Sequence, residues 1–323
     1  MEKYKSVVSI VIPVFNNSSQ IRETLLSIVV QTSKKWEVIC VDDGSDDVTC
    51  DIIREFSSKY PNIHLFVREN LPKGASHCRN IGLNNAKGEY VIFLDGDDLL
   101  APYCIEQRLA KIEKTNFNFV VFPNAVIKNG KIGPITSDKN IRRPKLAYAA
   151  NHAVWQTTCP IYKTEFVRSL GGFNENYPRM QDVEFNLRCL VASGNNYLNL
   201  LSTAVEDCYY RLYNNNVTQK KYDKTYAALP LFTKLIKDLN EQKNFQPSEF
   251  SHICFCLYCS MVMIRYNTSN RTSFEGLISF DMIKEMKCVD KFAYFIVKVF
   301  SFNEKLSYHV AHILRFIFIH LFF

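Results

Sequence analysis

Short apolar runs alternate with amphipathic segments between residues 7 and 94, and this alternation constrains the fold more than any other feature of the chain. The apolar runs have the length and composition of buried strands, and the segments between them repeat apolar residues at helical spacing. The expected strands cover 7–13, 36–41, 63–67 and 90–94. One expected helix begins near residue 21, and two others cover 51–59 and 76–86. Strands and helices that alternate in this way form a mainly parallel sheet flanked by helices, so the sequence predicts an α/β fold.

Acidic residues directly follow two of these strands. Asp42 and Asp43 come after the run 36–41, and the turn 95–98 comes after the run 90–94. In open α/β sheets, ligands bind beyond the carboxyl ends of the strands, where the strand order switches. We therefore expect both acidic groups at the ligand-binding edge of the sheet.

The turn 95–98 places three carboxylates, Asp95, Asp97 and Asp98, within four residues. Two like charges ~4 Å apart repel by about 4 kcal/mol at an effective dielectric constant near 20, and a bound cation removes that cost. Carboxylate oxygens suit Mn²⁺ or Mg²⁺, and Mg²⁺ commonly combines one or two carboxylates with phosphate oxygens and water. A solvated acidic turn is the alternative, but the preceding buried strand carries these side chains to the ligand edge, which favours a metal site.

Further charged residues flank the same edge. One carboxylate of the run 42–47 could accept hydrogen bonds from a base or a ribose, while Asp46 and Asp47 could merely cap the next helix. Lys73 and Arg79 lie in and after a glycine-containing loop, and a cation near a helix start can meet diphosphate charge. The alternative is that both are ordinary exposed surface cations.

Another acidic candidate lies further along the chain. The stretch 171–175 has the composition of a turn, and a helix with Asp182 and Glu184 in its first turn follows it. Asp182 could act as a general base that takes a proton from a hydroxyl group. Alternatively, both acids could stabilise the helix N-terminus through the backbone dipole.

Taken in order, these segments resemble family 2 glycosyltransferases of the GT-A fold, and the likeness spans roughly residues 7–218. The segments similar to the family's opening strand, nucleotide-contacting motif, donor-side helix and metal-binding DXD element are 8–16, 41–47, 79–83 and 95–98. Gly172-Phe173-Asn174-Glu175 followed by Gln181-Asp182 is similar to the stretch that carries the catalytic base. The segment 210–218 resembles the family's closing segment, and several ordered matches are more specific than any one of them.

The resemblance implies an inverting transfer of a sugar from a nucleotide diphosphate sugar, with a UDP-sugar as the expected donor, to a hydroxyl of a glycan or lipid-linked glycan. Asp43 would contact the nucleobase, Asp97 the ribose or the metal, and Asp98 the metal and diphosphate. Asp182 would be the base. Mn²⁺ or Mg²⁺ would bind at Asp95, Asp97 and Asp98, and the remaining donor-binding candidates are Pro13, Phe15, Asn16, Lys73, Arg79 and Arg211.

Two departures from the family pattern stand in this chain. Gln181 occupies the position where the family usually has Glu, and two extra residues separate Asn70 from Gly74, which could alter the donor pocket. The alternative function is a catalytically silent nucleotide-sugar-binding partner of a membrane polysaccharide assembly complex, and the retained Asp182 argues against it. A nicotinamide-dependent enzyme is not expected because no glycine-rich turn follows the first strand.

The rest of the chain changes character. Residues 127–148 are basic and rich in turn formers, which predicts a mobile loop near the site, and the strand pattern fades from residue 222 onward. The segments 229–239 and 250–266 are expected helices. We therefore expect a glycosyltransferase domain over 1–220, a helical appendage over 221–289 and a separate tail over 290–323.

The tail is aromatic and basic. Lys291, Lys298, Lys305 and His312 are spaced seven residues apart, which draws one polar stripe along a helix. Such a helix fits the plane of a membrane interface, where anionic lipid attracts its cations. Packing on the protein's own core or on a partner subunit is the alternative.

Composition bears on location and partners. The N-terminus runs into the first strand without an apolar signal segment, so we expect a cytoplasmic protein, peripheral on the cytoplasmic face of the membrane. The formal charge of +7 suits an anionic partner, but no basic run is interleaved with aromatics, so nucleic acid is not expected. The eleven cysteines are scattered through apolar stretches and are interpreted as reduced, buried thiols, including those beside His252 at 254, 256 and 259.

Overall fold

In the computed structural model, the described residues are 7–69, 71–213, 218–267, 290–291, 294–295 and 303–323. The chain forms two compact units that interleave along the sequence. The first unit contains Met1–Asp138, Trp155–Glu175 and Ala192–Tyr213, and the second contains Lys139–Val154, Asn176–Val191 and Asn214–Phe323. The expected domain limits near 220 and 289 stay predictions.

The first unit is built on a seven-stranded sheet with the strand order β10-β6-β9-β4-β1-β2-β3. Neighbouring strands are parallel except for β9, which is antiparallel to both β4 and β6. The strands are β1 (Val8–Val14), β2 (Trp36–Asp42), β3 (Ile63–Val67), β4 (Tyr90–Phe93), β6 (Phe119–Val121), β9 (Pro160–Lys163) and β10 (Tyr197–Asn199). The predicted mainly parallel α/β sheet is confirmed.

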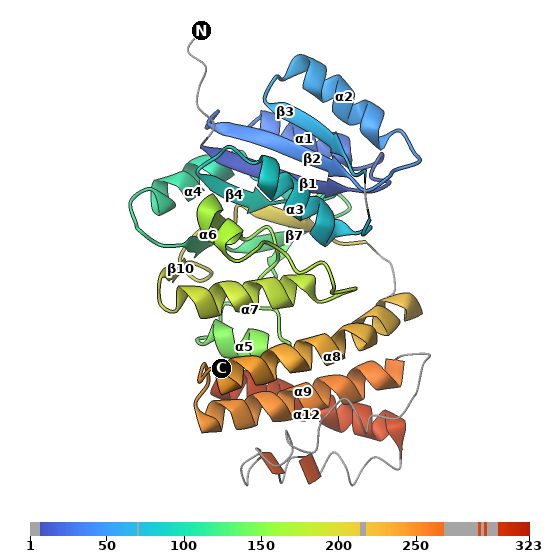
Figure 1. The fold of residues 1–323 in the computed structure, drawn as a ribbon, viewed down its shortest axis with the longest axis vertical. Coiled ribbons are helices and arrows are strands. Elements are labelled where there is room, and N and C mark those ends of the chain that lie inside the picture. Colours follow the sequence, from blue (N-terminus) through green and yellow to red (C-terminus); the bar gives the residue numbers. More distant parts are fainter. Residues whose placement is uncertain (1–6, 70, 214–217, 268–289, 292–293, 296–302) are drawn as a thin grey trace. The chain divides into compact units, whose positions relative to one another are not determined.

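Helices connect the parallel strands and flank the sheet (Figure 1). They are α1 (Ile21–Val29), α2 (Thr49–Lys59), α3 (Ala75–Asn85), α4 (Cys104–Ile112) and α6 (Thr164–Ser169). α1 packs with α2, and α3 packs with α6. Every residue of β1, β2 and β4 is buried, and each fully buried Val or Ile side chain contributes roughly 1.5–3 kcal/mol. The sheet is therefore the core that holds the loops at its edge in place.

A second, four-stranded sheet in the first unit has the order β5-β11-β7-β8. Its strands are β5 (Leu99–Leu100), β11 (Cys208–Arg211), β7 (Asn124–Lys128) and β8 (Lys131–Ile135). β5 directly follows the acidic turn 95–98 and pairs with β11, so this small sheet holds the turn from its carboxyl side.

The prediction of a mobile loop over 127–148 is wrong. β7 and β8 form a hairpin there, and α5 (Pro144–Ala149) follows in the second unit. Asn129 and Gly130 sit at the hairpin tip with φ of 50° and 72°. Asn-Gly is the preferred pair for a tight two-residue hairpin turn, so the turn formers in this segment marked a hairpin and not an irregular loop.

The second unit is helical, as expected for 229–239 and 250–266. Its longer helices are α7 (Gln181–Ser193, with its last residues in the first unit), α8 (Gln219–Glu241), α9 (Pro247–Asn267) and α12 (Glu304–Phe322). α12 packs along α9. Among the described residues, α9 alone has the length and apolar composition of a membrane span, and most of that span is buried inside the protein, as in a core helix.

Arg315 fixes α12 to the rest of the second unit. Its Nε donates to Ser260 Oγ at 2.7 Å and its guanidinium also donates to the carbonyl of Asn151 at 2.8 Å. Desolvation by burial lowers the pKa of this guanidinium from its usual value. One side of the tail helix thus packs on the protein itself, which is the alternative that the sequence left open.

A buried ion pair stabilises the first unit. Arg108 on α4 donates to both carboxylate oxygens of Asp207, from Nε at 2.9 Å and from a terminal nitrogen at 2.6 Å, and both side chains are fully buried. A third donor of Arg108 reaches the carbonyl of Thr158 at 2.8 Å. The pair therefore ties α4 to the segments that precede β11 and β9.

Replacing Asp207 by Asn should destabilise the protein by about 3–5 kcal/mol, because it leaves the Arg108 charge buried without a counter-charge. Urea unfolding followed by circular dichroism measures the loss. The control is Glu165→Gln, which breaks the exposed pair with Arg168 and should cost at most about 1 kcal/mol. Equal effects of the two substitutions would contradict the argument.

Candidate active site

The parallel pairing of β1 brings the two acidic turns to one edge of the sheet. β2 pairs with β1 so that Val14 lies opposite Asp42, and the amide of Asp43 donates to the carbonyl of Val14 at 2.9 Å. On the other side, the amide of Leu94 donates to the carbonyl of Val11 at 3.0 Å. The turn 95–98 therefore starts beside the carboxyl end of β1, as expected from the rule for open α/β sheets.

The carboxylates of Asp42 and Asp43 accept hydrogen bonds from different groups. The Asp42 carboxylate accepts from the amides of Gly44 and Ser45, both at 3.0 Å, and from the Ser45 hydroxyl at 2.5 Å, so it shapes its own turn. Asp43 is buried and accepts from Arg68 Nε at 2.7 Å and from the amide of Gly74 at 3.1 Å. The predicted nucleobase contact, Asp43, is thus held between two loops.

Arg68 is a site residue that the sequence analysis missed. It directly follows β3, and its guanidinium also donates to the backbone carbonyl of Asp43 at 3.2 Å. The rule that placed the acidic turns also applies to this strand end, so a cation after the run 63–67 was the available signal.

The end of β1 and the turn after it carry three of the predicted donor-binding residues. Pro13 is buried within β1, opposite Val41. Asn16 has a φ of 52°, its amide donates to Ser45 Oγ at 3.0 Å, and its side-chain oxygen accepts from the amide of Asp46 at 3.1 Å. These bonds lock the turn to the loop after β2 and leave Phe15 between them with 46% of its surface exposed.

Lys73 lies over this exposed ring. Its ammonium nitrogen is 3.9 Å from the centroid of Phe15, well within the range of a cation–π contact. The structure therefore brings Phe15, Asp43 and Lys73 together through the loop that ends at Gly74.

The acidic turn 95–98 is matched by two arginines. Arg79, which is nearly buried, donates to Asp95 at 2.5 Å and lies 5.1 Å from the ring centroid of Phe173. Arg211 donates its backbone amide to the buried Asp98 carboxylate at 2.9 Å and its Nε to the carbonyl of Asp97 at 2.8 Å. Two of the predicted donor-binding cations, Arg79 and Arg211, thus contact the predicted metal-binding turn.

Burial and mutual repulsion disfavour the ionised form of the carboxylates in this turn. Burial raises the pKa of Asp98 well above its usual range, and the Asp95 charge adds to the rise. The pKa of Asp97 is raised for the same two reasons. Burial and the Asp97 charge raise the pKa of Tyr213, which hydrogen-bonds Asp97, to about 12. A cation that approaches these carboxylates would relieve the repulsion.

The donor chemistry of the turn fits a divalent cation, but as a partial site. Its ligands would be carboxylate oxygens, which Mn²⁺ and Mg²⁺ prefer. Within the part of the chain that the structure describes, no group of three His, Cys, Asp or Glu side chains surrounds a common point. A cation here would therefore be completed by phosphate oxygens and water, as is usual for Mg²⁺ beside a nucleotide.

Asp182 lies in the second unit, at the start of α7, and its role as the base stays a prediction. The other acid of this turn, Glu184, is buried and paired with Arg188 Nε at 2.5 Å. Asp182 is partly exposed, so it is the acid of the pair that solvent or a ligand can reach. The neighbouring Gln181 side-chain oxygen is buried and has no hydrogen-bond partner among the described residues.

The loop 171–175 is fastened to α3. Asn80 donates to the carbonyl of Phe173 at 2.9 Å and accepts from its amide at 2.8 Å, and it also donates to Glu175 at 2.7 Å. His77 Nδ1 lies 2.8 Å from a Glu175 oxygen. The sequence analysis did not find Asn80 or Glu175 as positioning residues, although both lie within the matched motifs. Their bonds keep Phe173 beneath Arg79.

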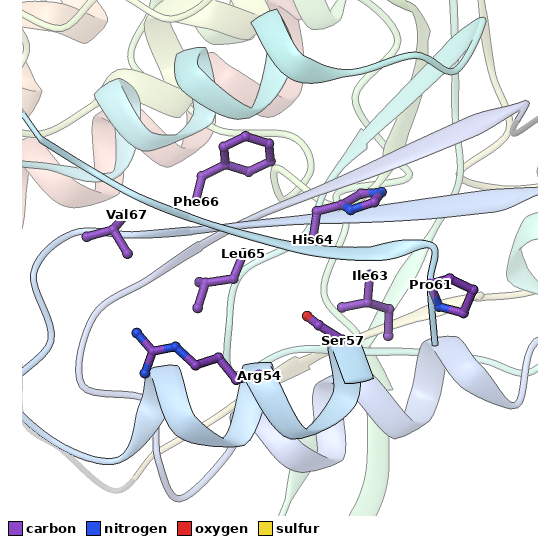
Figure 2. Close-up of a pocket in the computed structure, with 8 residues that line it drawn as sticks. All are labelled: Arg54, Ser57, Pro61, Ile63, His64, Leu65, Phe66 and Val67. Carbon is purple, nitrogen blue, oxygen red and sulfur yellow. The ribbon is translucent and has the colours of Figure 1, made fainter. Parts of the chain in front are cut away.

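A separate hollow of about 540 Å³ lies beside the edge strand β3. Figure 2 shows Ile63 and Leu65 pointing from this strand toward α2, where Arg54 and Ser57 complete the wall. None of its lining residues is acidic, and it is not formed by the acidic turns. Its polar side chains include Arg54 and His64 but no carboxylate, so it lacks the ligands that Mg²⁺ and Mn²⁺ prefer.

Comparisons with known proteins agree on one family. Residues 9–167 match the family model described as glycosyl transferase family 2. The chain is 43% identical over 95 residues to the poly(ribitol-phosphate) beta-glucosyltransferase of Bacillus spizizenii, an alignment that covers 29% of this chain and 15% of that protein. It is 36% identical over 120 residues to the cholesterol galactosyltransferase of Borreliella burgdorferi, covering 37% and 32%. The chain therefore spans about a third or less of the length of these curated relatives.

Solved structures show the same fold. Residues 1–349 of S. aureus TarS in complex with UDP-GlcNAc superpose with a TM-score of 0.60 at 18% identity, covering 96% of this chain and 91% of that one. The mannosyltransferase PcManGT of Pyrobaculum calidifontis in complex with GDP-Man and Mn²⁺ gives 0.57 at 15% identity, covering 97% and 88%. At these identities the likeness establishes the GT-A-type fold.

Gly172→Ala should destabilise the protein more than Gly171→Ala. Both glycines have positive φ, 69° and 76°, but an added Cβ at Gly172 would lie 2.4 Å from Asn80 Oδ1, whereas Gly171 has open space. Left-handed backbone costs each variant about 1 kcal/mol, and the displaced Asn80 bonds add about 1–2 kcal/mol to Gly172→Ala. Thermal unfolding of the two variants measures the difference, and equal melting temperatures would refute the role of Asn80.

Proposed function

We propose that this chain, which carries a glycosyl transferase family 2 domain over residues 9–167, moves a sugar from a nucleotide diphosphate sugar to a hydroxyl of a glycan or lipid-linked glycan. The observation that carries the proposal is the turn 95–98, where the buried Asp98 and the partly exposed Asp95 and Asp97 lie beside Arg79 and Arg211 at the carboxyl edge of the sheet. A nucleotide diphosphate carries negative charge that the two arginines would bind. Its phosphate oxygens would also complete the ligands of a cation held by the carboxylates.

The donor would bind along this edge with its base near Asp43. The Asp43 carboxylate is a hydrogen-bond acceptor held by Arg68 and Gly74, and it suits an N–H group on the edge of a base. A UDP-sugar is the proposed donor, by analogy with the UDP-GlcNAc and UDP complexes of TarS. Arg79 and Arg211 would lie toward the diphosphate.

Mn²⁺ or Mg²⁺ held by Asp95, Asp97 and Asp98 would supply positive charge beside the departing diphosphate. A Mn²⁺ complex of the Pyrobaculum mannosyltransferase supports divalent metal in this fold. The protein's own part is to hold the two arginines in place before the reaction, because donors fixed in advance need no reorganisation as charge develops.

Asp182 is the proposed base. Its carboxylate would take the proton of the acceptor hydroxyl while the acceptor oxygen bonds to the anomeric carbon and the bond from that carbon to the diphosphate oxygen breaks. Attack from the face opposite the diphosphate inverts the configuration at the anomeric carbon. The partly exposed Asp182 beside the ion-paired Glu184 supports this choice.

Asp182→Asn should leave donor binding within about twofold of the unchanged protein and reduce sugar transfer by about 10²–10⁴, the usual contribution of a general base. A thermal-shift panel of UDP, GDP and their sugars, with and without Mn²⁺, measures binding, and donor hydrolysis or transfer measures turnover. Asp238→Asn, an exposed change on α8, is the matched control. Substantial turnover in Asp182→Asn would remove Asp182 from the base role.

The same assays separate the rival function. A catalytically silent binding protein would show the nucleotide-dependent thermal shift but neither hydrolysis nor transfer in the unchanged chain. The retained Asp182 favours the enzyme.

We further propose that the protein is peripheral on the cytoplasmic face of a membrane, with α12 at the lipid surface. One side of α12 packs inward through Ala311, Phe318 and Ile319, while the other side exposes large apolar residues. The exposed set is Leu306, Ile313, Phe316, Ile317 and Leu321. Exposed Lys305, His309 and His312 accompany them, and anionic lipid would attract the cationic groups.

Replacing both Phe316 and Leu321 by Ser should weaken binding to phosphatidylglycerol vesicles by roughly tenfold or more, because two large apolar side chains no longer enter the bilayer. Sedimentation with vesicles at low and high salt measures the partition. Ile132→Ser, an equally exposed position on β8, is the control and should have no effect. Unchanged sedimentation of the double variant would contradict the membrane role of α12.

A further inference from the structure

Phe15 presents an aromatic surface at the site proposed for the nucleobase. It is the first residue after β1, and hydrogen bonds on either side of it tie it to the Asp43 turn: Asp43 donates its amide to the carbonyl of Val14, and Asn16 donates its amide to Ser45 Oγ. Almost half of the Phe15 side chain is exposed. An exposed aromatic ring next to a base-edge acceptor is a stacking platform for any nucleobase.

Lys73 already occupies that platform. Its ammonium lies 3.9 Å from the ring centroid, and no carboxylate within the described ranges pairs with it. The ammonium covers one face of the ring, and the exposed Lys73 leaves this contact open to solvent. A base that stacks on this face must therefore displace the ammonium.

The loop that carries Lys73 is anchored on the proposed base-binding residue. Gly74, the next residue, donates its amide to Asp43 at 3.1 Å, and Arg68, at the other end of the loop, donates to the same oxygen at 2.7 Å. The backbone amide of Arg68 also donates to the carbonyl of Asp42 at 2.9 Å, so the backbone is fastened on either side of Lys73, whose side chain is held by the ring contact. The side chain can thus move without the loop.

We infer that Lys73 makes the site discriminate between phosphorylated nucleotides and free nucleosides by competing with the base for Phe15. This inference rests on the proposed nucleotide-sugar function. A nucleoside that stacks on Phe15 loses the cation–π contact and gives the displaced ammonium no new partner. A nucleoside diphosphate supplies phosphate oxygens, so the ammonium exchanges an aromatic ring for an anion. The cation thus opposes nucleoside binding and supports diphosphate binding.

The test compares the two ligand classes in one variant. Lys73→Met keeps an unbranched apolar side chain and removes the charge. Uridine should bind about two- to fivefold more tightly, because the lost cation–π contact no longer competes. UDP should bind about two- to fivefold more weakly, because an exposed cation near its phosphates is gone. Isothermal titration gives both dissociation constants, and guanosine with GDP is the second pair measured.

Two control variants test whether the effect is specific to Lys73 and whether it depends on the Phe15 ring. Lys111→Met, which removes an exposed charge from α4, should change neither constant. In a Phe15→Leu background, Lys73→Met should no longer tighten uridine, because the platform for which the two compete is absent.

Equal or weaker uridine binding by Lys73→Met, or a change of uridine and UDP affinity in the same direction, overturns the competition. Failure of the proposed function gives a different result, in which the unchanged chain binds neither UDP nor GDP, and that result overturns both.

Discussion

The site depends on one constraint, the parallel pairing of β1 with β2 on one side and β4 on the other. Parallel neighbours end at the same edge, so three loops that are far apart in the sequence meet there whatever residues they contain. The buried strands fix that edge because a shift of register by one residue would turn their core side chains outward. The chemistry of the site is then decided by which side chains follow each strand.

Charge balance at this edge comes from elsewhere in the chain. Asp43 is matched by Arg68 after β3, Asp95 by Arg79 on α3, and the Asp98 carboxylate by the backbone of Arg211 at the end of β11. Asp43 and Asp95 thus each pair with an arginine from a different element, whereas Asp98 accepts from a neutral backbone amide, and the sheet alone would leave these carboxylates repelling one another. The arginines are both structural ties and the groups that a diphosphate would meet.

The sequence predicted the sheet and the placement of the acidic turns because both follow from local periodicity and the strand-end rule. It did not predict the contacts of Asn80, which need long-range information, or the hairpin β7–β8, which has a local signal. The bonds between Asn80 and Phe173 join residues 93 positions apart, and no local pattern encodes such a pair. The Asn-Gly turn at 129–130 is a local signal for a hairpin, but the basic, turn-rich composition of 127–148 fits an irregular loop equally well.

Two of the acidic side chains at this edge are committed to backbone donors. Asp42 accepts from its own turn, and Asp47 accepts from the amides of Ser18 and Thr49 at the start of α2. Desolvation is the largest single contribution and opposes ionisation of Asp47, but the hydrogen bonds with Thr49 and Ser18 together outweigh it and lower its pKa to about 2. Asp43 and Asp98 each accept one backbone amide, from Gly74 and Arg211, whereas Asp42 and Asp47 each accept two. Asp95 instead pairs with Arg79, and Asp97 hydrogen-bonds the Tyr213 phenol. Carboxylates that the sequence shows as equivalent thus differ in how many backbone donors they already accept, and Asp42 and Asp47 retain the least capacity for a ligand.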